Sequence, residues 1–228
     1  MIDESWVEEI LAGMSVEEKV GQTLFPRIYG YFLGESDETF LQYVRWIKDL
    51  HVGGLELFFG DIYGSAILLN RLQEISDIPL LISCDDETGM GHRIAGATHL
   101  THNMGLGATG NEHMAYLQGK ITALEGRAVG VHIFEGPTLD VNINPDNPII
   151  AVRSFGDDPE FVGRMGKAFI RGIQEHGMIA CAKHFPGHGN TTVDSHMDIP
   201  VIRESRDYLE KNDLLPFPWQ SRTASWAS

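Results

Sequence analysis

The sequence predicts an α/β fold built on a parallel sheet, because short apolar runs alternate with longer segments of helical periodicity. The runs are bounded by Gly or Pro and are almost continuously apolar, as strands covered on both faces are. Five such runs with intervening helices favour a (β/α) barrel or a doubly wound sheet. The predicted strands are residues 22–26, 55–59, 79–84, 129–134 and 178–183, with 198–202 as a candidate sixth, and the predicted helices are 37–50, 65–75, 111–127 and 159–176.

Two helix starts carry specific local signals. Ser15 is a predicted N-cap, because Glu18 follows three residues later and completes a capping box. Pro159 stands in the first turn of its helix, where the missing backbone amide costs nothing.

The composition is that of a globular protein with a strongly acidic surface. Against 32 Asp and Glu, the 228 residues include 17 Lys and Arg, so the net charge is 17 − 32 = −15. Such a surface repels phosphate backbones and anionic lipids, which argues against nucleic-acid and membrane partners. No apolar run approaches the roughly 18–20 residues that would span a bilayer. The length predicts a single domain with a sizeable core.

The sequence also predicts a cytoplasmic location. Its first residues are acidic and polar, whereas a secretory signal is basic and then apolar. Cys84 and Cys181 each lie in an apolar run, so both are expected to pack in the core as reduced thiols.

Functional groups are densest in residues 183–196, KHFPGHGNTTVDSH, which follow a predicted strand. The carboxyl ends of parallel strands are where α/β enzymes place reactive groups. Asp194 and His196 are two residues apart, so the carboxylate can orient the imidazole and favour its protonated form as a proton donor. The alternative is a polar loop whose histidines are only solvated.

A metal site is a second interpretation of the same segment. His184, His188 and His196 supply three imidazoles, and a His-x3-His spacing binds metal when it lies on a helix. Pro186 and Gly187 separate the first two histidines, so this spacing is not helical and a metal site is disfavoured.

Charged residues follow two further segments. Asp85, Asp86 and Glu87 end a predicted strand with Arg93 just beyond, which fits either a polyhydroxylated ligand or a solvated acidic loop. Arg153 follows a Pro- and Asn-rich loop, where it can clamp a ligand or form a surface salt bridge. The phosphate-binding Gly-Lys-Ser/Thr loop and the Gly-x-Ser-x-Gly nucleophile elbow are both missing from the sequence, which argues against nucleotides and serine hydrolysis.

Together these residues resemble the N-terminal barrel of glycoside hydrolase family 3, most closely its bacterial β-N-acetylglucosaminidases. The resemblance extends from about residue 14 to residue 217 and is strongest at KHFPGHG. The trailing Asp-x-His adds specificity, since other branches of the family lack it. The matching segments are 14–22, 85–89, 139–142, 153–156 and 183–189.

The resemblance implies a (β/α)8 barrel of the TIM type and a retaining hydrolase that removes terminal β-linked N-acetylglucosamine from short amino-sugar glycosides. It implies that His196 is the general acid/base and that Asp194 orients it, an unusual choice in a class that mostly uses carboxylates. A hydrolase of this kind is expected to need no cofactor and no metal, and its expected partner is a small carbohydrate. The residues implied to bind the sugar are Asp85, Arg93, Arg153, Lys183 and His184.

The sequence departs from the family at two places. Asp85–Gly89 reads Asp-Asp-Glu-Thr-Gly where the family usually has Asp-Gln-Glu-Gly-Gly, which is expected to add negative charge near the sugar pocket. The family's nucleophilic aspartate belongs to a later strand, and residues 218–228 contain no acid and match no family segment. The sequence therefore predicts one incomplete barrel domain over residues 1–228, with about five to six βα units and a non-family tail at 218–228.

Three hypotheses follow from the sequence: a retaining β-N-acetylglucosaminidase, a sugar-binding fragment without turnover, and a metal-dependent hydrolase. An incomplete barrel is also expected to self-associate through open sheet edges.

Overall fold

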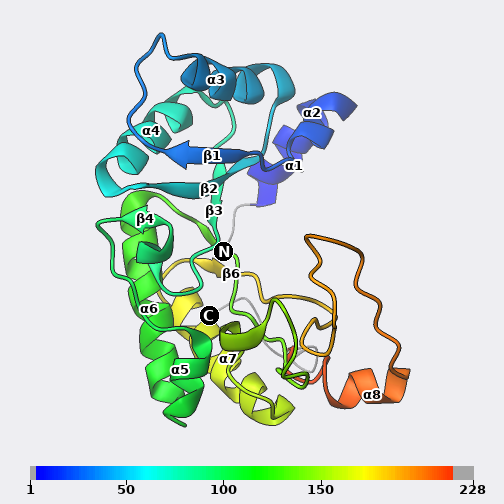
Figure 1. The fold of residues 1–228 in the computed structure, drawn as a ribbon. Helices are drawn as coiled ribbons and strands as arrows, with labels where there is room; N and C mark the ends of the chain where they lie inside the picture. Colours follow the sequence, from blue (N-terminus) through cyan, green and yellow to red (C-terminus); the bar gives the residue numbers. More distant parts are fainter. Residues whose placement is uncertain (1–3, 218–228) are drawn as a thin grey trace.

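The computed structural model describes residues 4–217 and shows an α/β fold around one parallel sheet (Figure 1). The strand order is β1-β2-β3-β5-β6, and the short β4 pairs with β2 outside this path. The predicted fold class, a partial barrel of alternating strands and helices, is confirmed. The elements are α1 Glu4–Gly13, α2 Val16–Gly21, β1 Arg27–Gly30, α3 Glu38–Leu50, β2 Gly54–Asp61, α4 Ile62–Ile75, β3 Leu81–Cys84, β4 Ile94–Ala95, α5 Asn103–Ala108, α6 Glu112–Val129, β5 Ile133–Phe134, α7 Pro159–Gln174, β6 Ile179–Ala180 and α8 Arg206–Lys211, with 3-10 turns at Met90–His92 and Ala151–Arg153.

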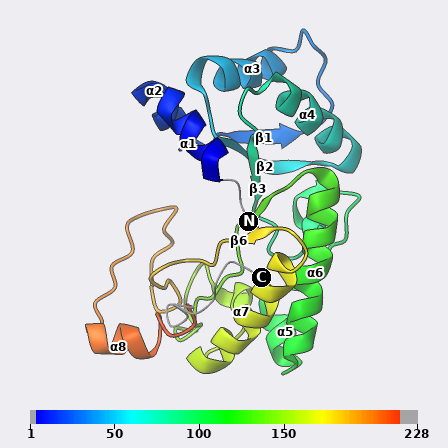
Figure 2. The ribbon, with the colours of Figure 1, turned by 180° about the vertical axis from the view of Figure 1, so that it is seen from behind.

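The sheet is buried on one face only within the described residues. Helices α3 and α4 flank β1 and β2, while α6 and α7 pack together beside β6 (Figures 1 and 2). Leu55 and Leu57 of β2 point into this helical layer and are fully buried. On the opposite face, Tyr29, Leu81 and Ile179 are 45%, 41% and 48% exposed. The core therefore lies between the sheet and its helices.

Local side-chain hydrogen bonds fix the helix starts. The predicted capping box of α2 is confirmed: Ser15 Oγ accepts from the Glu18 amide, and Glu18 accepts from the Ser15 amide. Asp37, Asp61 and Asp158 cap α3, α4 and α7 in the same manner, each accepting from amides of the first turn. These contacts satisfy backbone donors that have no partner inside the helix.

The first predicted strand is wrong in position. Residues 22–26 form a turn and an extended link, and β1 begins immediately afterwards at Arg27. Ile28 is buried on the helical face, whereas Arg27 and Tyr29 point to the open face. The strand therefore alternates in polarity, and a search for continuously apolar runs passes over it.

Several other predictions need correction at their ends. Helix α6 extends to Val129 and ends at Gly130, so β5 occupies only the last two residues of the predicted strand 129–134. Strand β6 likewise occupies two residues of 178–183. The candidate strand 198–202 is not a strand, and its Ile199 is 82% exposed. The tail predicted at 218–228 lies outside the described residues.

The two cysteines differ in their surroundings. Cys84 is buried at the end of β3, as expected. Cys181, which was expected to pack, is exposed just after β6. Among the described residues no strand pairs with the outer edge of β6, so Cys181 lies next to an open edge of the sheet.

The strand ends bring distant segments of the chain together. Strand β3 pairs with β5 through Cys84 and Phe134, and β5 pairs with β6 through Phe134 and Ala180. A parallel bridge between Thr138 and Lys183 extends this pairing beyond the strands. The carboxyl ends of β3, β5 and β6 therefore lie side by side. Within residues 4–217, no helix is long and apolar enough to cross a membrane.

Removing an aromatic side chain from the layer between sheet and helices should strongly destabilise the fold. Phe169 of α7 is fully buried and stacks on Phe134 with ring centroids 5.4 Å apart. We expect Phe169→Ala to lower the free energy of unfolding by about 3–5 kcal/mol. The matched change Phe32→Ala, at a residue 69% exposed, should cost less than about 0.5 kcal/mol. Urea denaturation followed by circular dichroism measures both, and equal losses would contradict this core assignment.

Candidate active site

A cluster of five charged side chains lies at the carboxyl ends of β3 and β6. Lys183 Nζ lies 2.6 Å from Asp85 Oδ1 and 2.9 Å from Glu87 Oε1. Arg153 Nη2 lies 2.7 Å from Glu87 Oε1, and Arg93 Nη2 lies 3.2 Å from Asp85 Oδ2. The structure thus brings together Asp85, Arg93, Arg153 and Lys183, four of the five residues that sequence analysis selected for sugar binding.

Mutual compensation keeps this cluster ionised. Burial by itself would raise the pKa of Glu87, but the hydrogen bonds and charges of Arg153 and Lys183 lower that pKa to about 2. Burial likewise acts to lower the pKa values of Lys183 and Arg153, and the facing carboxylates outweigh it and raise both. Buried charges are tolerated when they are paired in this way.

Two aromatic rings hold Arg93 in place. Its guanidinium carbon lies 4.2 Å from the centroid of Phe58 and 5.0 Å from that of Phe59, both on β2. Stacking of a guanidinium on aromatic faces is favourable. Arg93 Nε also donates to the Asp85 carbonyl at 3.0 Å. Arg93 is therefore fixed between β2 and the segment after β3.

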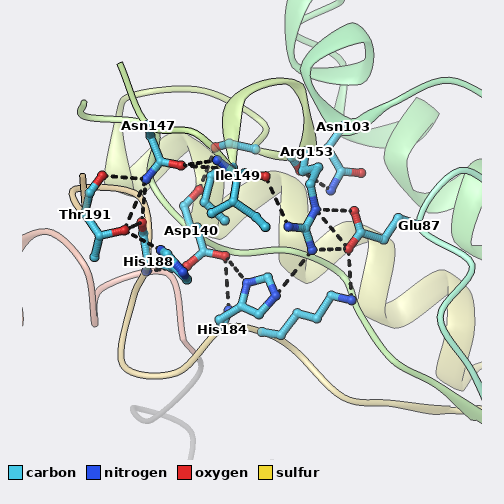
Figure 3. A network of polar contacts seen from close by, with 12 residues as sticks. Glu87, Asn103, Asp140, Asn147, Ile149, Arg153, His184, His188 and Thr191 are labelled. Carbon is cyan, nitrogen blue, oxygen red and sulfur yellow. Dashed lines mark hydrogen bonds and ion pairs between the residues drawn. The ribbon is translucent and has the colours of Figure 1, made fainter. Parts of the chain in front are cut away.

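The fifth predicted binding residue, His184, joins the cluster through two neighbours (Figure 3). Its Nδ1 lies 2.6 Å from Asp140 Oδ2, and its Nε2 lies 3.3 Å from Arg153 Nη2. Asp140 is fully buried. Neither Glu87 nor Asp140 was predicted as a site residue on its own, although both lie in segments that carried the resemblance.

The histidine-rich segment after β6 folds tightly around its glycines. Gly187 has a φ of +139°, and a Cβ there would lie 2.6 Å from Asp213 Cβ. A Cβ on Gly189 would lie 1.8 Å from the Val141 carbonyl oxygen. Only glycine fits such close approaches.

The three histidines of this segment are not arranged around one point. His184 contacts Asp140 and Arg153, while His188 Nδ1 bonds to Thr191 Oγ1. His196 bonds to Asp194. Within the described part of the chain, no group of three or more His, Cys, Asp or Glu side chains is placed to hold a metal ion.

The structure pairs Asp194 with His196. Asp194 Oδ1 accepts from the His196 backbone amide at 2.9 Å and lies 2.7 Å from His196 Nδ1. These two hydrogen bonds lower the pKa of Asp194. The pair lies on the long segment before α8, which projects from the rest of the fold in both views (Figures 1 and 2).

This pair does not reach the charged cluster. The His196 side chain is 76% exposed, and among residues 4–217 its hydrogen-bond partner is Asp194. The structure therefore joins the two residues to each other but not to the predicted sugar-binding residues.

Asp86 does not add exposed charge beside the charged cluster, contrary to expectation. Its side chain is fully buried, and neither carboxylate oxygen forms a hydrogen bond of good geometry with a described residue. Burial, with a smaller contribution from the charge of Asp85, raises the pKa of Asp86 to about 7, although the nearby Cys84 thiol and Arg93 oppose this shift. A substantial fraction of this carboxyl is therefore protonated at neutral pH.

Comparison with known proteins decides the family. Residues 15–221 match the Glycosyl hydrolase family 3 N terminal domain. The chain belongs to glycoside hydrolase family 3. The family 3 resemblance of the sequence motifs is thereby confirmed, together with the type of fold that it implied.

Individual relatives within family 3 have related activities. The β-hexosaminidase A of Pseudoalteromonas piscicida is 37% identical over 184 residues, which are 75% of this chain and 31% of that protein. The structure of a β-N-acetylglucosaminidase from Paenibacillus sp. str. FPU-7 is 38% identical with a TM-score of 0.83, covering 90% of this chain and 39% of that one. A β-glucoside phosphorylase solved with bound 2FGlc is 32% identical with a TM-score of 0.85, covering 93% and 38%. The chain thus spans about a third to two fifths of the length of these relatives.

The buried carboxyl of Asp86 should make stability depend on pH. The pKa of Asp86 is about 7 in the folded state against an ordinary value of 3.8, so the folded state binds more protons between these pH values. Stability therefore falls as pH rises through this window, by about 2–3 kcal/mol between pH 5 and pH 8. We expect Asp86→Asn to remove this dependence, as measured by urea denaturation at both pH values.

Asp157→Asn provides the control for this measurement, because Asp157 is exposed. This variant should retain the pH dependence of the wild type. If Asp86→Asn and Asp157→Asn respond to pH alike, the carboxyl of Asp86 is not the responsible group.

Proposed function

We propose that this chain carries the sugar-binding part and the general acid/base of a retaining β-N-acetylglucosaminidase. The substrates would be short amino-sugar glycosides, such as cell-wall fragments, in the cytoplasm. The observation that carries the proposal is the cluster of Asp85, Glu87, Arg93, Arg153 and Lys183, with His184 beside it, at one end of a family 3 sheet. The hexosaminidase and N-acetylglucosaminidase activities of two relatives support the choice of sugar.

The chemistry of the cluster suits a neutral, polyhydroxylated ligand. Three cationic and two anionic side chains largely compensate one another, so the cluster has only a small net charge. Sugar hydroxyls both donate and accept hydrogen bonds, and the cluster offers N–H donors from Arg and Lys beside carboxylate acceptors. Lys183 uses two of its three N–H groups on Asp85 and Glu87 among the described residues, which leaves one for a ligand.

The pair of Asp194 and His196 provides the proton transfer of the proposed reaction. Asp194 holds the Nδ1 side of the imidazole, which leaves Nε2 to donate a proton to the glycosidic oxygen as its bond to the anomeric carbon breaks. The carboxylate stabilises the imidazolium before this transfer. An aspartate would attack the anomeric carbon to form the glycosyl-enzyme, as the family resemblance implies, and no residue of 4–217 is assigned this role. Water then releases the sugar while His196 takes a proton back.

A second candidate is a protein that binds the sugar without turnover. It is favoured by the separation of His196 from the charged cluster in the described structure. A third alternative, transfer of the sugar to phosphate, is suggested by the likeness to a β-glucoside phosphorylase. A metal-dependent hydrolase receives no support from the placement of the three histidines.

We also propose that the open edges and the uncovered face of the sheet favour self-association.

The proposed binding role predicts that Arg153 is needed for sugar affinity. We expect N-acetylglucosamine to bind this chain in isothermal titration and to bind Arg153→Ala at least about tenfold more weakly, since a charged hydrogen-bond donor is lost. Arg164→Ala is the control, because Arg164 forms an exposed ion pair with Glu112. Equal affinity in all three proteins would remove Arg153 from the site, and glucose binding as tight as N-acetylglucosamine would overturn the choice of sugar.

Turnover of an aryl N-acetyl-β-glucosaminide separates the candidates. If the chain is a complete hydrolase, it releases the phenol, and His196→Ala loses at least about a hundredfold in rate. Binding without release supports the second candidate. Release that requires added phosphate and yields a sugar phosphate supports the phosphorylase. Turnover that His196→Ala leaves unchanged contradicts the assignment of His196 as the acid/base.

A further inference from the structure

The carboxylate of Asp140 is a fully buried charge that three N–H groups stabilise. One oxygen, Oδ2, accepts from His184 Nδ1 at 2.6 Å and from the His184 backbone amide at 3.1 Å. The other oxygen, Oδ1, accepts from the His188 backbone amide at 2.6 Å. A buried carboxylate requires such donors, and here all of them come from the segment after β6.

The neighbours of His184 determine which of its ring nitrogens carries the proton (Figure 3). Nδ1 faces a carboxylate oxygen and must donate to it, so Nδ1 is protonated. Nε2 faces Arg153 Nη2 at 3.3 Å, and a guanidinium has no acceptor. Nε2 must therefore accept, which leaves the neutral ring protonated at Nδ1 alone.

This tautomer in turn fixes Arg153. Its Nε donates to Glu87, and its Nη2 donates to Glu87 on one side and to His184 Nε2 on the other. Its Nη1 donates to the Ile149 carbonyl at 3.2 Å. Within the described residues four of the five N–H groups are thus engaged, and one Nη1–H remains for a ligand. The direction of this free Nη1–H depends on the hydrogen bond that His184 Nε2 accepts from Nη2 of the same guanidinium.

The second oxygen of Asp140 acts on the other half of the segment. His188, whose amide it holds, bonds through its ring to Thr191, and Asn147 Nδ2 donates to the Thr191 carbonyl at 3.0 Å. This folded stretch leads directly to Asp194 and His196. One carboxylate therefore anchors both the sugar-binding histidine and the base of the segment that carries the proposed acid/base.

We propose that Asp140 is a positioning residue for the sugar site: it holds His184 in the Nδ1-protonated form, and His184 thereby orients Arg153. Asp140 itself touches no ligand, because its side chain is fully buried. The inference deepens the proposed function, on which its effect on sugar affinity rests. The tautomer of His184 does not depend on that function.

Nitrogen-15 NMR of the labelled chain at mildly alkaline pH tests the tautomer directly. We expect His184 to show a pyrrole-type Nδ1 and a pyridine-type Nε2, with its signals assigned by their loss in His184→Gln. In Asp140→Ala the ring should show averaged shifts with a population protonated at Nε2. The control Asp146→Ala, an exposed acid in the same loop, should leave the signals unchanged. A purely structural role of Asp140 would not produce this change of tautomer.

Sugar binding provides the second readout. Asp140→Ala should bind N-acetylglucosamine at least about tenfold more weakly than the wild type and Asp146→Ala. If Asp140→Ala does not fold, Asp140→Asn, which keeps the volume and one acceptor oxygen, should show an intermediate loss.

Two results overturn the proposal. One is a wild-type His184 protonated at Nε2, either alone or together with Nδ1. The other is a folded Asp140→Ala with unchanged His184 signals and unchanged affinity. If the wild type does not bind N-acetylglucosamine at all, the proposed function fails, while the nitrogen shifts still decide the relation of Asp140 to His184.

Discussion

The site depends on the compensation of one nearly buried carboxylate, that of Glu87. This carboxylate accepts hydrogen bonds from Arg153 and forms an ion pair with Lys183. The two cations come from two other segments of the chain. A charge removed from water must be paired, so the ends of β3 and β6 and the loop before α7 are held at a fixed separation. Loss of either partner would leave this buried charge only partly compensated and would therefore destabilise the fold. The geometry of the charged cluster follows from this electrostatic requirement.

Asp140 extends the same principle away from the charged cluster. Its carboxylate accepts N–H groups of His184 and His188, so the segment after β6 is anchored close to the sheet. Beyond that anchor the chain runs out to the exposed pair of Asp194 and His196. In the described structure the charged cluster is therefore well connected, and the pair proposed to transfer protons lies apart from it. The hydrolase and the protein that binds without turnover, the two leading candidates, differ in the role they give to this pair.

The sheet explains both the success and the errors of sequence reasoning about the fold. Strands β2 and β3 are mostly apolar, with polar exceptions such as Glu56 and Ser83, and both were predicted close to their observed positions. Strand β1 alternates between the buried Ile28 and residues of the open face, so its pattern did not match the one expected for a sheet covered on both faces. The exposed Cys181 reflects the same uncovered face and edge. The periodicity of apolar residues along a strand reflects which of its faces are buried. Which faces are buried depends on the layers that pack against the sheet.

The residues proposed to bind sugar were named from the sequence, but the way in which they pair was not. Nothing in the run of three adjacent acids indicated that Asp85 and Glu87 would each pair with cations while Asp86 turns into the core. Asp140 lies in one of the segments that carried the family resemblance. No local signal indicated that its carboxylate would accept hydrogen bonds from both His184 and His188.

The sequence by itself determined the class of fold, the starts of α2 and α7 and the chemical types gathered in the site. It did so because caps, turns and periodicity act between residues only a few positions apart, as with Ser15 and Glu18. Only the tertiary structure decided which charges pair, since Arg153 and Glu87 are 66 residues apart and Lys183 and Asp85 are 98 apart. Strand pairing in a parallel sheet brings such distant residues to one edge, and the cost of burying an unpaired charge then selects their partners.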